Sequence, residues 1–178
     1  MDLKKYITIT NDFPKKGISF KDLSPLLYDK DAFKYAVDLM ADAIKEYRPD
    51  VIVGPEARGF LFGSAVAYAL GIGFVMARKK GKLPGETVSV DYELEYGSDS
   101  LFIPSGLIKP GSRVCLVDDL LATGGTMYAL AKLVRKIGAE PILLLTLMEL
   151  TSVPRVEGFD ELEFKSLLRY ENWYGYWK

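Results

Sequence analysis

The stretch Val117-Asp118-Asp119-Leu120-Leu121-Ala122-Thr123-Gly124-Gly125-Thr126 decides how this sequence folds. It begins in Val114–Val117, an apolar run typical of a buried strand. It then passes two carboxylates and a turn of small residues before it enters Thr126–Ile137, which has helical spacing. Small residues at a helix start leave backbone N–H groups free, and the helix dipole adds partial positive charge there. The stretch therefore predicts a phosphate cradle between a strand and a helix.

Two carboxylates next to this turn need a separate explanation. Asp118 and Asp119 would repel a phosphate that touched them, so they are better suited to accept hydrogen bonds from neutral vicinal hydroxyls, such as the diol of a ribose. Thr123 and Thr126 can add hydroxyl donors to the turn. The lysine of a Walker loop is absent. A purely structural interpretation, an acidic cap followed by a glycine turn, remains the alternative.

On both sides of this stretch, short apolar runs alternate with helical spacing. Helices are expected over Asp31–Tyr47, which carries one apolar stripe, and over Gly59–Leu70. The other runs expected as strands are Val51–Val53, Phe74–Ala77 and Pro141–Met148, although the last could also be a piece of buried helix. This alternation predicts βαβ units and a parallel sheet covered on both faces, hence a three-layer α/β domain.

Two more predicted strand ends carry cations. Arg58 follows the strand at Val53, where its planar fork of donors suits a phosphate. The run Arg78–Gly85 holds four cations and opens a glycine-punctuated excursion with Glu95 near its far end, an organisation typical of a lid. Most charge runs are solvated loops, and a lone arginine is more often a surface ion-pair residue. Because ligands of open α/β sheets bind beyond the carboxyl ends of the strands, we expect a pentose with a phosphate at one end and a pyrophosphate at the other.

Composition removes several classes of mechanism. The 178 residues include no histidine, so histidine-based triads and histidine-ligated zinc are excluded. The formal charge of −1 gives no general attraction to nucleic acid or anionic membrane, and neither is expected as a partner. Cys115 is the only cysteine, and the N-terminus leads into no apolar segment. We expect a cytoplasmic protein with one domain, residues 1–178.

The quoted stretch resembles the phosphoribosyl diphosphate (PRPP) signature of the type I phosphoribosyltransferase family. Further segments, in the right order and spacing, are similar to the members of that family that act on adenine. These segments are Asp12–Asp22, Ala57–Gly63, Arg78–Gly85, Leu94–Gly97 and Asp119–Thr126. The resemblance implies the type I fold with a small N-terminal hood, about residues 1–28, and a flexible lid loop, about residues 79–100. The aromatic tail, residues 172–178, matches nothing in the family. We interpret it as a packed or frayed terminus, and the alternative is that it covers an apolar patch or extends a dimer interface.

The resemblance also implies an activity, the formation of AMP and pyrophosphate from adenine and PRPP, and it assigns residues to that activity. Glu95 and Arg58 would be catalytic, and the Glu56–Ala57 peptide would be cis. Adenine would contact Ser19, Phe20, Lys21 and Leu120. PRPP would contact Arg58, Arg78, Lys79, Lys82, Asp118, Asp119, Ala122, Thr123, Gly124, Gly125 and Thr126.

Magnesium and a second subunit follow from the same resemblance. No dedicated metal cluster is evident in the sequence, so magnesium is expected to arrive with PRPP, held by substrate oxygens and water. A homodimer is implied because lid cations of the family reach a neighbouring subunit's site. Two alternatives stay open: transfer to a 6-oxopurine such as hypoxanthine, guanine or xanthine, and a non-catalytic PRPP-sensing module.

Overall fold

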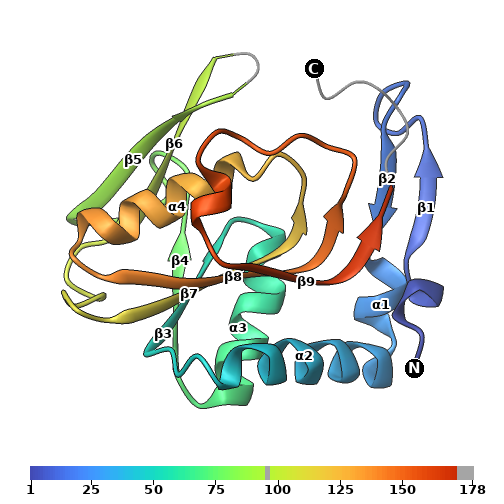
Figure 1. The fold of residues 1–178 in the computed structure, drawn as a ribbon, viewed down its shortest axis with the longest axis horizontal. Coiled ribbons are helices and arrows are strands. Elements are labelled where there is room, and N and C mark those ends of the chain that lie inside the picture. Colours follow the sequence, from blue (N-terminus) through green and yellow to red (C-terminus); the bar gives the residue numbers. More distant parts are fainter. Residues whose placement is uncertain (95–96, 172–178) are drawn as a thin grey trace.

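The computed structural model describes residues 1–94 and 97–171. Its centre is a five-stranded sheet in the order β4-β3-β7-β8-β9, with every neighbouring pair parallel (Figure 1). The strands are β3 (Val51–Pro55), β4 (Gly73–Ala77), β7 (Arg113–Leu121), β8 (Glu140–Leu150) and β9 (Phe164–Tyr170). The three-layer α/β fold with a parallel sheet, predicted from the sequence, is confirmed.

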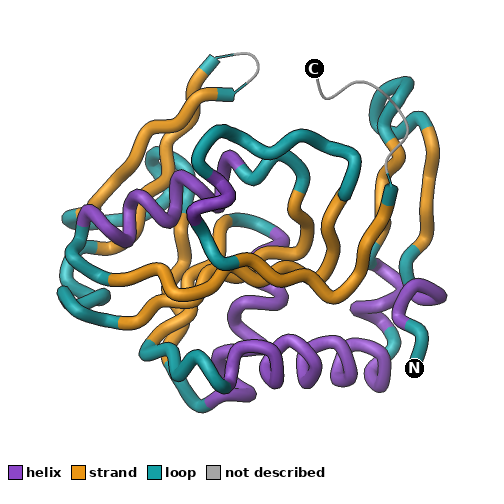
Figure 2. Tube along the Cα trace, viewed as in Figure 1, coloured by secondary structure: helices purple, strands orange, loops and turns teal. Residues whose placement is uncertain are grey.

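Helices cover both faces of this sheet (Figure 2). On one face lie α2 (Lys30–Lys45) and α3 (Arg58–Leu70), whose buried residues share one hydrophobic core with β3, β7 and β8. On the other face lies α4 (Gly125–Lys136), which forms a second core together with a two-stranded hairpin. Its strands, β5 (Thr87–Glu93) and β6 (Ser98–Pro104), are antiparallel.

The longest helix shows how local sequence and packing agree. The carboxylate of Asp29 accepts hydrogen bonds from the backbone of Asp31 and Ala32 at 3.0 and 2.9 Å, which caps the start of α2. The side chains of Met40 and Ile44, four residues apart on one face, are fully buried. Each contributes roughly 1.5–3 kcal/mol through burial of its apolar surface. The helix is therefore fixed at its start by the cap and along its length by its apolar stripe.

Residues of the predicted hood lie beside the free edge of β9 (Figure 1). They form the short 3-10 helix η1 (Leu3–Tyr6), the antiparallel pair β1 (Thr8–Asn11) and β2 (Ser19–Asp22), and α1 (Ser24–Tyr28). A second short 3-10 helix, η2 (Phe159–Glu161), precedes β9. No helix in the described ranges is both long and apolar enough to cross a membrane.

The segment Pro141–Met148, expected as a strand with a helix as the alternative, lies within strand β8, so the strand is confirmed. Two differences from the sequence-based expectations concern other strands. Strand β7 continues to Leu121 rather than ending at Val117, because it stays paired with β8 as far as the Leu121–Glu149 position. Strand β9 was not expected, since charged residues interrupt its apolar pattern. The site residues Asp118, Asp119 and Leu120 therefore belong to a strand.

Candidate active site

The strand order places the candidate site at the sheet's topological switch point. From β3 the chain crosses through α3 to β4 on one side, and from β7 it crosses through α4 to β8 on the other. Connections that diverge in this way leave a crevice beyond the carboxyl ends of the two central strands, which is where α/β sheets bind ligands. The two most informative sequence motifs, the residues after β3 and those at the end of β7, meet there.

The end of β7 and the start of α4 form the predicted phosphate turn, Ala122–Thr126. Gly124 has φ of +80°, a left-handed conformation that favours glycine, and a Cβ there would lie 2.6 Å from the Phe159 ring. The Gly125 N–H donates to the Thr123 hydroxyl at 3.3 Å. A cavity of about 130 Å³ is lined by this turn together with Asp118 and residues 120, 121 and 127. The turn thus has the conformation and the hollow that a phosphate cradle needs.

The two carboxylates at the end of β7 are in unusual electrostatic states. Asp119 is 3% exposed, and its Oδ2 lies 2.9 Å from Nε of Arg58. That ion pair lacks hydrogen-bond alignment, so no described residue donates a hydrogen bond to Oδ2. Asp118 accepts the Asp119 backbone N–H at 2.8 Å. Burial, together with the charge of Asp119, raises the pKa of Asp118 well above its ordinary value, against a smaller lowering by Arg58.

Residues after β3 and β4 gather around one acidic side chain. Glu56 accepts hydrogen bonds through Oε1 from the Lys79 backbone at 2.7 Å and from Nε of Arg78 at 3.3 Å. Lys79 is also ion-paired with Asp99 of β6 at 2.9 Å. The structure therefore brings Arg78 and Lys79 to the end of β3, whereas Lys82 is exposed in the turn that follows.

The peptide bond between Glu56 and Ala57 is cis, which confirms the expectation drawn from the resemblance. It lies between the end of β3 and the start of α3. Arg58 is the first residue of that helix and reaches from it toward Asp119.

The hood contributes an aromatic ring to the same region. The Phe20 ring centre lies 5.6 Å from Cζ of Arg58, so Arg58 lies between the hood and Asp119. On the neighbouring position of β2, Lys21 is 5% exposed, and its Nζ donates to the carbonyl and hydroxyl oxygens of Ser19 at 3.0 and 2.8 Å. Burial lowers the pKa of Lys21. Leu120 of β7 is half-buried.

Two sequence-based interpretations lie outside the described residues. Glu95, the proposed proton carrier, is one of them, and the aromatic tail at 172–178 is the other. The hairpin that carries residue 95 is described on both sides of it, and Leu94 donates its backbone N–H to Gly97 at 2.8 Å. In the same hairpin, burial raises the pKa of Tyr92, and the neighbouring Thr126 side chain of the phosphate turn opposes this rise in part.

Sequence reasoning missed the segment that supports the phosphate turn from behind. Arg155 and Val156, which follow β8, contact the carbonyl oxygens of Ala122 and Thr123. More than thirty residues separate the partners. No local pattern marks them, because the contact depends on the parallel pairing of β7 with β8.

This fold and this site define a class, the phosphoribosyltransferases. The family model described as phosphoribosyl transferase domain matches residues 27–167. Among curated proteins, the adenine phosphoribosyltransferase of Desulfitobacterium hafniense is 54% identical over 170 residues, which cover 96% of this chain and 98% of that protein. The chain belongs to the adenine phosphoribosyltransferase family and is a transferase.

Solved structures agree with this assignment. The crystal structure of adenine phosphoribosyltransferase from Thermoanaerobacter pseudethanolicus superimposes with a TM-score of 0.91 at 50% identity, covering 95% of this chain and 98% of that one. That of the Saccharomyces cerevisiae enzyme, complexed with an imino-altritol bisphosphate and adenine, gives 0.85 at 39% identity, covering 94% and 97%.

Proposed function

We propose that this enzyme transfers the 5-phosphoribosyl group of PRPP to adenine and forms AMP and pyrophosphate. The relatives' names support the choice of reaction. The observation that carries the proposal within this chain is the buried Asp119 Oδ2, to which no residue of 1–94 or 97–171 donates a hydrogen bond, beside the hollow of the phosphate turn. Buried polar atoms are almost always hydrogen-bonded in folded proteins. A ribose hydroxyl would supply the missing donor.

PRPP would lie across the ends of β3 and β7. Its 5′-phosphate would bind the N–H groups and threonine hydroxyls of residues 122–126, at the positive end of α4. Its ribose hydroxyls would donate to Asp118 and Asp119. Its pyrophosphate would face Arg58 and the cations after β4. The 2.9 Å contact between Arg58 and Asp119 supports this arrangement, because it shows that the two strand ends are within reach of one small ligand.

The reaction breaks the bond between the anomeric carbon and a pyrophosphate oxygen, and a ring nitrogen of adenine forms the new bond. Positive charge develops on the ribose and negative charge on the leaving group, as in other glycosyl transfers. Arg58, Arg78, Lys79 and Lys82 would stabilise the leaving pyrophosphate electrostatically. Glu95 would accept or relay the proton that adenine loses. A hairpin closed over the site would exclude water from the reacting carbon.

Magnesium fits this site as an ion delivered by the substrate. Residues 1–94 and 97–171 contain no group of three or more acidic or sulfur side chains arranged to hold a metal ion. Asp118 and Asp119 could nevertheless accept hydrogen bonds from water around an ion bound to PRPP. When bound, magnesium would add positive charge to the pyrophosphate oxygens.

Adenine would be selected by the hood. The Phe20 ring and Leu120 would enclose the faces of the base, and backbone groups around Ser19 and Lys21 would contact its edge. Adenine donates through its amine and accepts at the adjacent ring nitrogen, and a 6-oxopurine reverses that pattern. The wrong base would leave buried polar groups unpaired, at a cost of a few kcal/mol.

A second copy of the chain is part of the proposal. Tyr28 and Tyr68 are 92% and 90% exposed, and they flank a hollow of about 850 Å³ between α2 and α3. Large exposed aromatic side chains around a hollow are typical of a protein–protein contact. We propose that this face, on the side of the sheet opposite α4, contributes to a homodimer.

A base-by-base turnover assay tests the reaction. The purified chain is incubated with PRPP, magnesium and, in turn, adenine, hypoxanthine, guanine or xanthine, and nucleotide formation is measured by chromatography. We expect AMP from adenine, with kcat/KM at least about a hundredfold higher than for the other bases. Turnover of 6-oxopurines alone would contradict the choice of base, and PRPP binding with no turnover of any base would contradict catalysis.

A further inference from the structure

The segment 151–158, which we name the buttress, runs between β8 and η2 and passes behind the phosphate turn. It contacts the turn through its backbone and through a side chain. The Val156 N–H donates to the Thr123 carbonyl at 2.8 Å, and a guanidinium N–H of Arg155 donates to the Ala122 carbonyl. Directly after the buttress, the Phe159 ring packs against Gly124. Three successive residues of the turn are thus held from one side.

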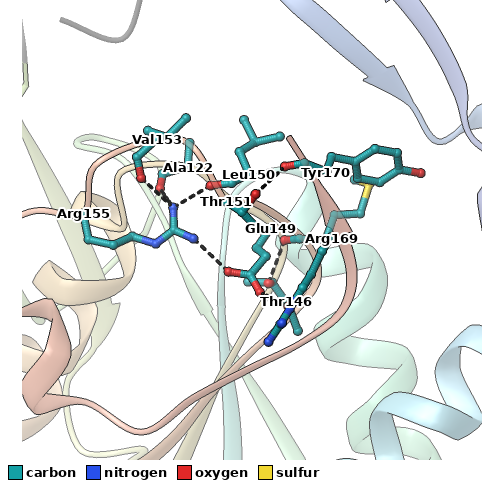
Figure 3. Close-up of polar contacts among 11 residues, drawn as sticks. Ala122, Thr146, Glu149, Leu150, Thr151, Val153, Arg155, Arg169 and Tyr170 are labelled. Atoms are coloured by element: carbon teal, nitrogen blue, oxygen red, sulfur yellow. Dashed lines mark hydrogen bonds and ion pairs between the residues drawn. The ribbon is translucent and has the colours of Figure 1, made fainter. Parts of the chain in front are cut away.

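Arg155 is the centre of this support (Figure 3). Besides the Ala122 carbonyl, its Nη1 donates to the carbonyl oxygens of Leu150 at 2.9 Å and Val153 at 3.2 Å. Its Nη2 donates to Oε2 of Glu149 at 2.9 Å. The Arg155 side chain is 22% exposed. Its planar fork spans a carboxylate and three carbonyls at once, which a lysine ammonium cannot do with the same geometry.

Glu149 is itself held in place. It is 8% exposed, and its Oε1 accepts hydrogen bonds from Oγ of Ser166 at 2.7 Å and Nε of Arg169 at 3.0 Å. The carboxylate therefore fixes the Arg155 guanidinium from the end opposite to the Ala122 carbonyl (Figure 3). The Arg169 side chain is 78% exposed and, within residues 1–94 and 97–171, forms a hydrogen bond and ion pair with Glu149 but none with the turn, so the two arginines share one partner and differ in the others.

The hydrogen bonds to the Ala122 and Thr123 carbonyls also determine which way the next N–H groups point. In a trans peptide the C=O and the following N–H point in opposite directions. A donor fixed on the Ala122 carbonyl therefore turns the Thr123 N–H away from Arg155, and a donor on the Thr123 carbonyl does the same for the Gly124 N–H. A charged donor also polarises the peptide, which strengthens its N–H as a donor. Both N–H groups belong to the proposed phosphate cradle.

We propose that Arg155, fixed by Glu149, is a positioning residue for the 5′-phosphate site: it holds the turn's carbonyl oxygens on one side, so that its N–H groups face the ligand. The inference rests on the proposed function, in which this turn binds the 5′-phosphate of PRPP. It predicts that loss of Arg155 weakens the binding of ligands that carry the 5′-phosphate and leaves the binding of other ligands unchanged.

Arg155→Gln tests this role, with Arg169→Gln as the matched control, because the same substitution there removes a partner of Glu149 without touching the turn. AMP and inorganic pyrophosphate are titrated calorimetrically, and KM is measured for PRPP and for adenine. In Arg155→Gln we expect AMP affinity to fall and the KM for PRPP to rise about tenfold, as loss of a charged hydrogen bond predicts. Pyrophosphate affinity and the KM for adenine should stay within about twofold. Arg169→Gln should match the wild type.

Equal AMP affinity in the two variants would overturn the inference, and so would an equal loss of AMP and pyrophosphate. Arg155→Lys keeps the charge but not the fork, and we expect it to recover only part of the AMP affinity. If Arg155→Gln fails to fold, Arg155→Lys decides the question by the same ratio of AMP to pyrophosphate affinity. A wild-type enzyme that binds neither AMP nor PRPP would instead contradict the proposed function, and the inference would fall with it.

Discussion

The two edges of the central sheet, at the carboxyl and the amino ends of its strands, differ in how their charged side chains are hydrogen-bonded. At the carboxyl edge, Asp119 has a buried oxygen that receives no hydrogen bond from the part of the chain that the structure describes, and the pKa of Asp118 is raised well above its ordinary value by burial and by the charge of Asp119. At the amino edge, Arg113 donates to the Tyr47 carbonyl at 2.7 Å through Nη2, and Asp50 accepts the Arg113 backbone N–H at 2.8 Å. Among the described residues, the carboxyl edge thus holds a buried carboxylate oxygen without a hydrogen bond, whereas these amino-edge groups bond to one another.

Further contacts at the amino edge fit this contrast. The Tyr47 hydroxyl donates to Glu163, and that hydrogen bond is the main reason why the pKa of Tyr47 is raised. The ammonium of Lys165 lies 4.8 Å from the centre of the same ring. These contacts join the end of α2 to β7 and β9. Polar groups that satisfy one another stabilise the fold, whereas unsatisfied ones at a crevice indicate where stability was given up for binding.

Removal of a carboxylate at the carboxyl edge should give the largest effect. Asp119→Ala removes the acceptor of a ribose hydroxyl, and we expect PRPP affinity to fall about a hundredfold, since hydrogen bonds to a charged group contribute about 1.5–3 kcal/mol each. The measurement is a calorimetric titration with PRPP, and circular dichroism checks that the fold is intact. Unchanged affinity would remove Asp119 from the ribose site.

Asp118→Asn should stabilise the free enzyme. Because the pKa of Asp118 is raised, the folded state holds this proton more tightly than the unfolded chain, whose pKa is near 3.8. Stability contributed by the proton is therefore present below about pH 3.8 and is lost as the pH rises through the folded-state pKa. We expect the Asn variant to gain about 1–2 kcal/mol at pH 8 and less at pH 5.

Thermal unfolding of Asp118→Asn and the wild type at both pH values tests this. A gain that does not grow from pH 5 to pH 8, or a lower Tm at pH 8, would show that ionisation of Asp118 does not oppose folding.

A substitution at the amino edge should lower stability without changing substrate binding, and its effect should be smaller. Arg113→Gln loses the hydrogen bonds to the Tyr47 and Arg48 carbonyls, which lie in exposed surroundings. We expect a loss of about 1 kcal/mol, or about 2–4 °C in Tm for a chain of this size. The KM for PRPP should not change. A rise in that KM with unchanged Tm would show that Arg113 acts in substrate binding rather than in stability, and would contradict the contrast between the two edges.

Much of the fold was predictable because its signals are local. The apolar stripe over Asp31–Tyr47 predicted α2, observed at Lys30–Lys45, and α3 ends at Leu70 as expected, before Gly71 with φ of +69°. Strand β9 (Phe164–Tyr170) was missed because it lies at the edge of the sheet, where polar side chains reach solvent and the apolar pattern breaks. The strands of the hood are four residues long, and β1 is exposed throughout, so their apolar pattern is equally weak.

In the candidate site, too, features with a local sequence signal could be predicted and features that depend on distant residues could not. The positions of Arg58, Asp119 and the phosphate turn at strand ends could be predicted, since each motif lies within a few consecutive residues, while their roles toward PRPP stay predictions. The residue roles of the base site and of Glu95 stay predictions drawn from resemblance. Arg155 could not be found from the sequence, because its partner Ala122 lies on the neighbouring strand's turn.

By itself, then, the sequence determined the strand–turn–helix unit around Val117–Thr126, because small residues, carboxylates and an apolar run act on their immediate neighbours. Only the tertiary structure decided that Arg58 reaches Asp119 and that Arg155 holds the turn from behind. Those contacts depend on which strands become neighbours in the sheet. That choice is made by burial of both sheet faces, to which residues along the whole chain contribute.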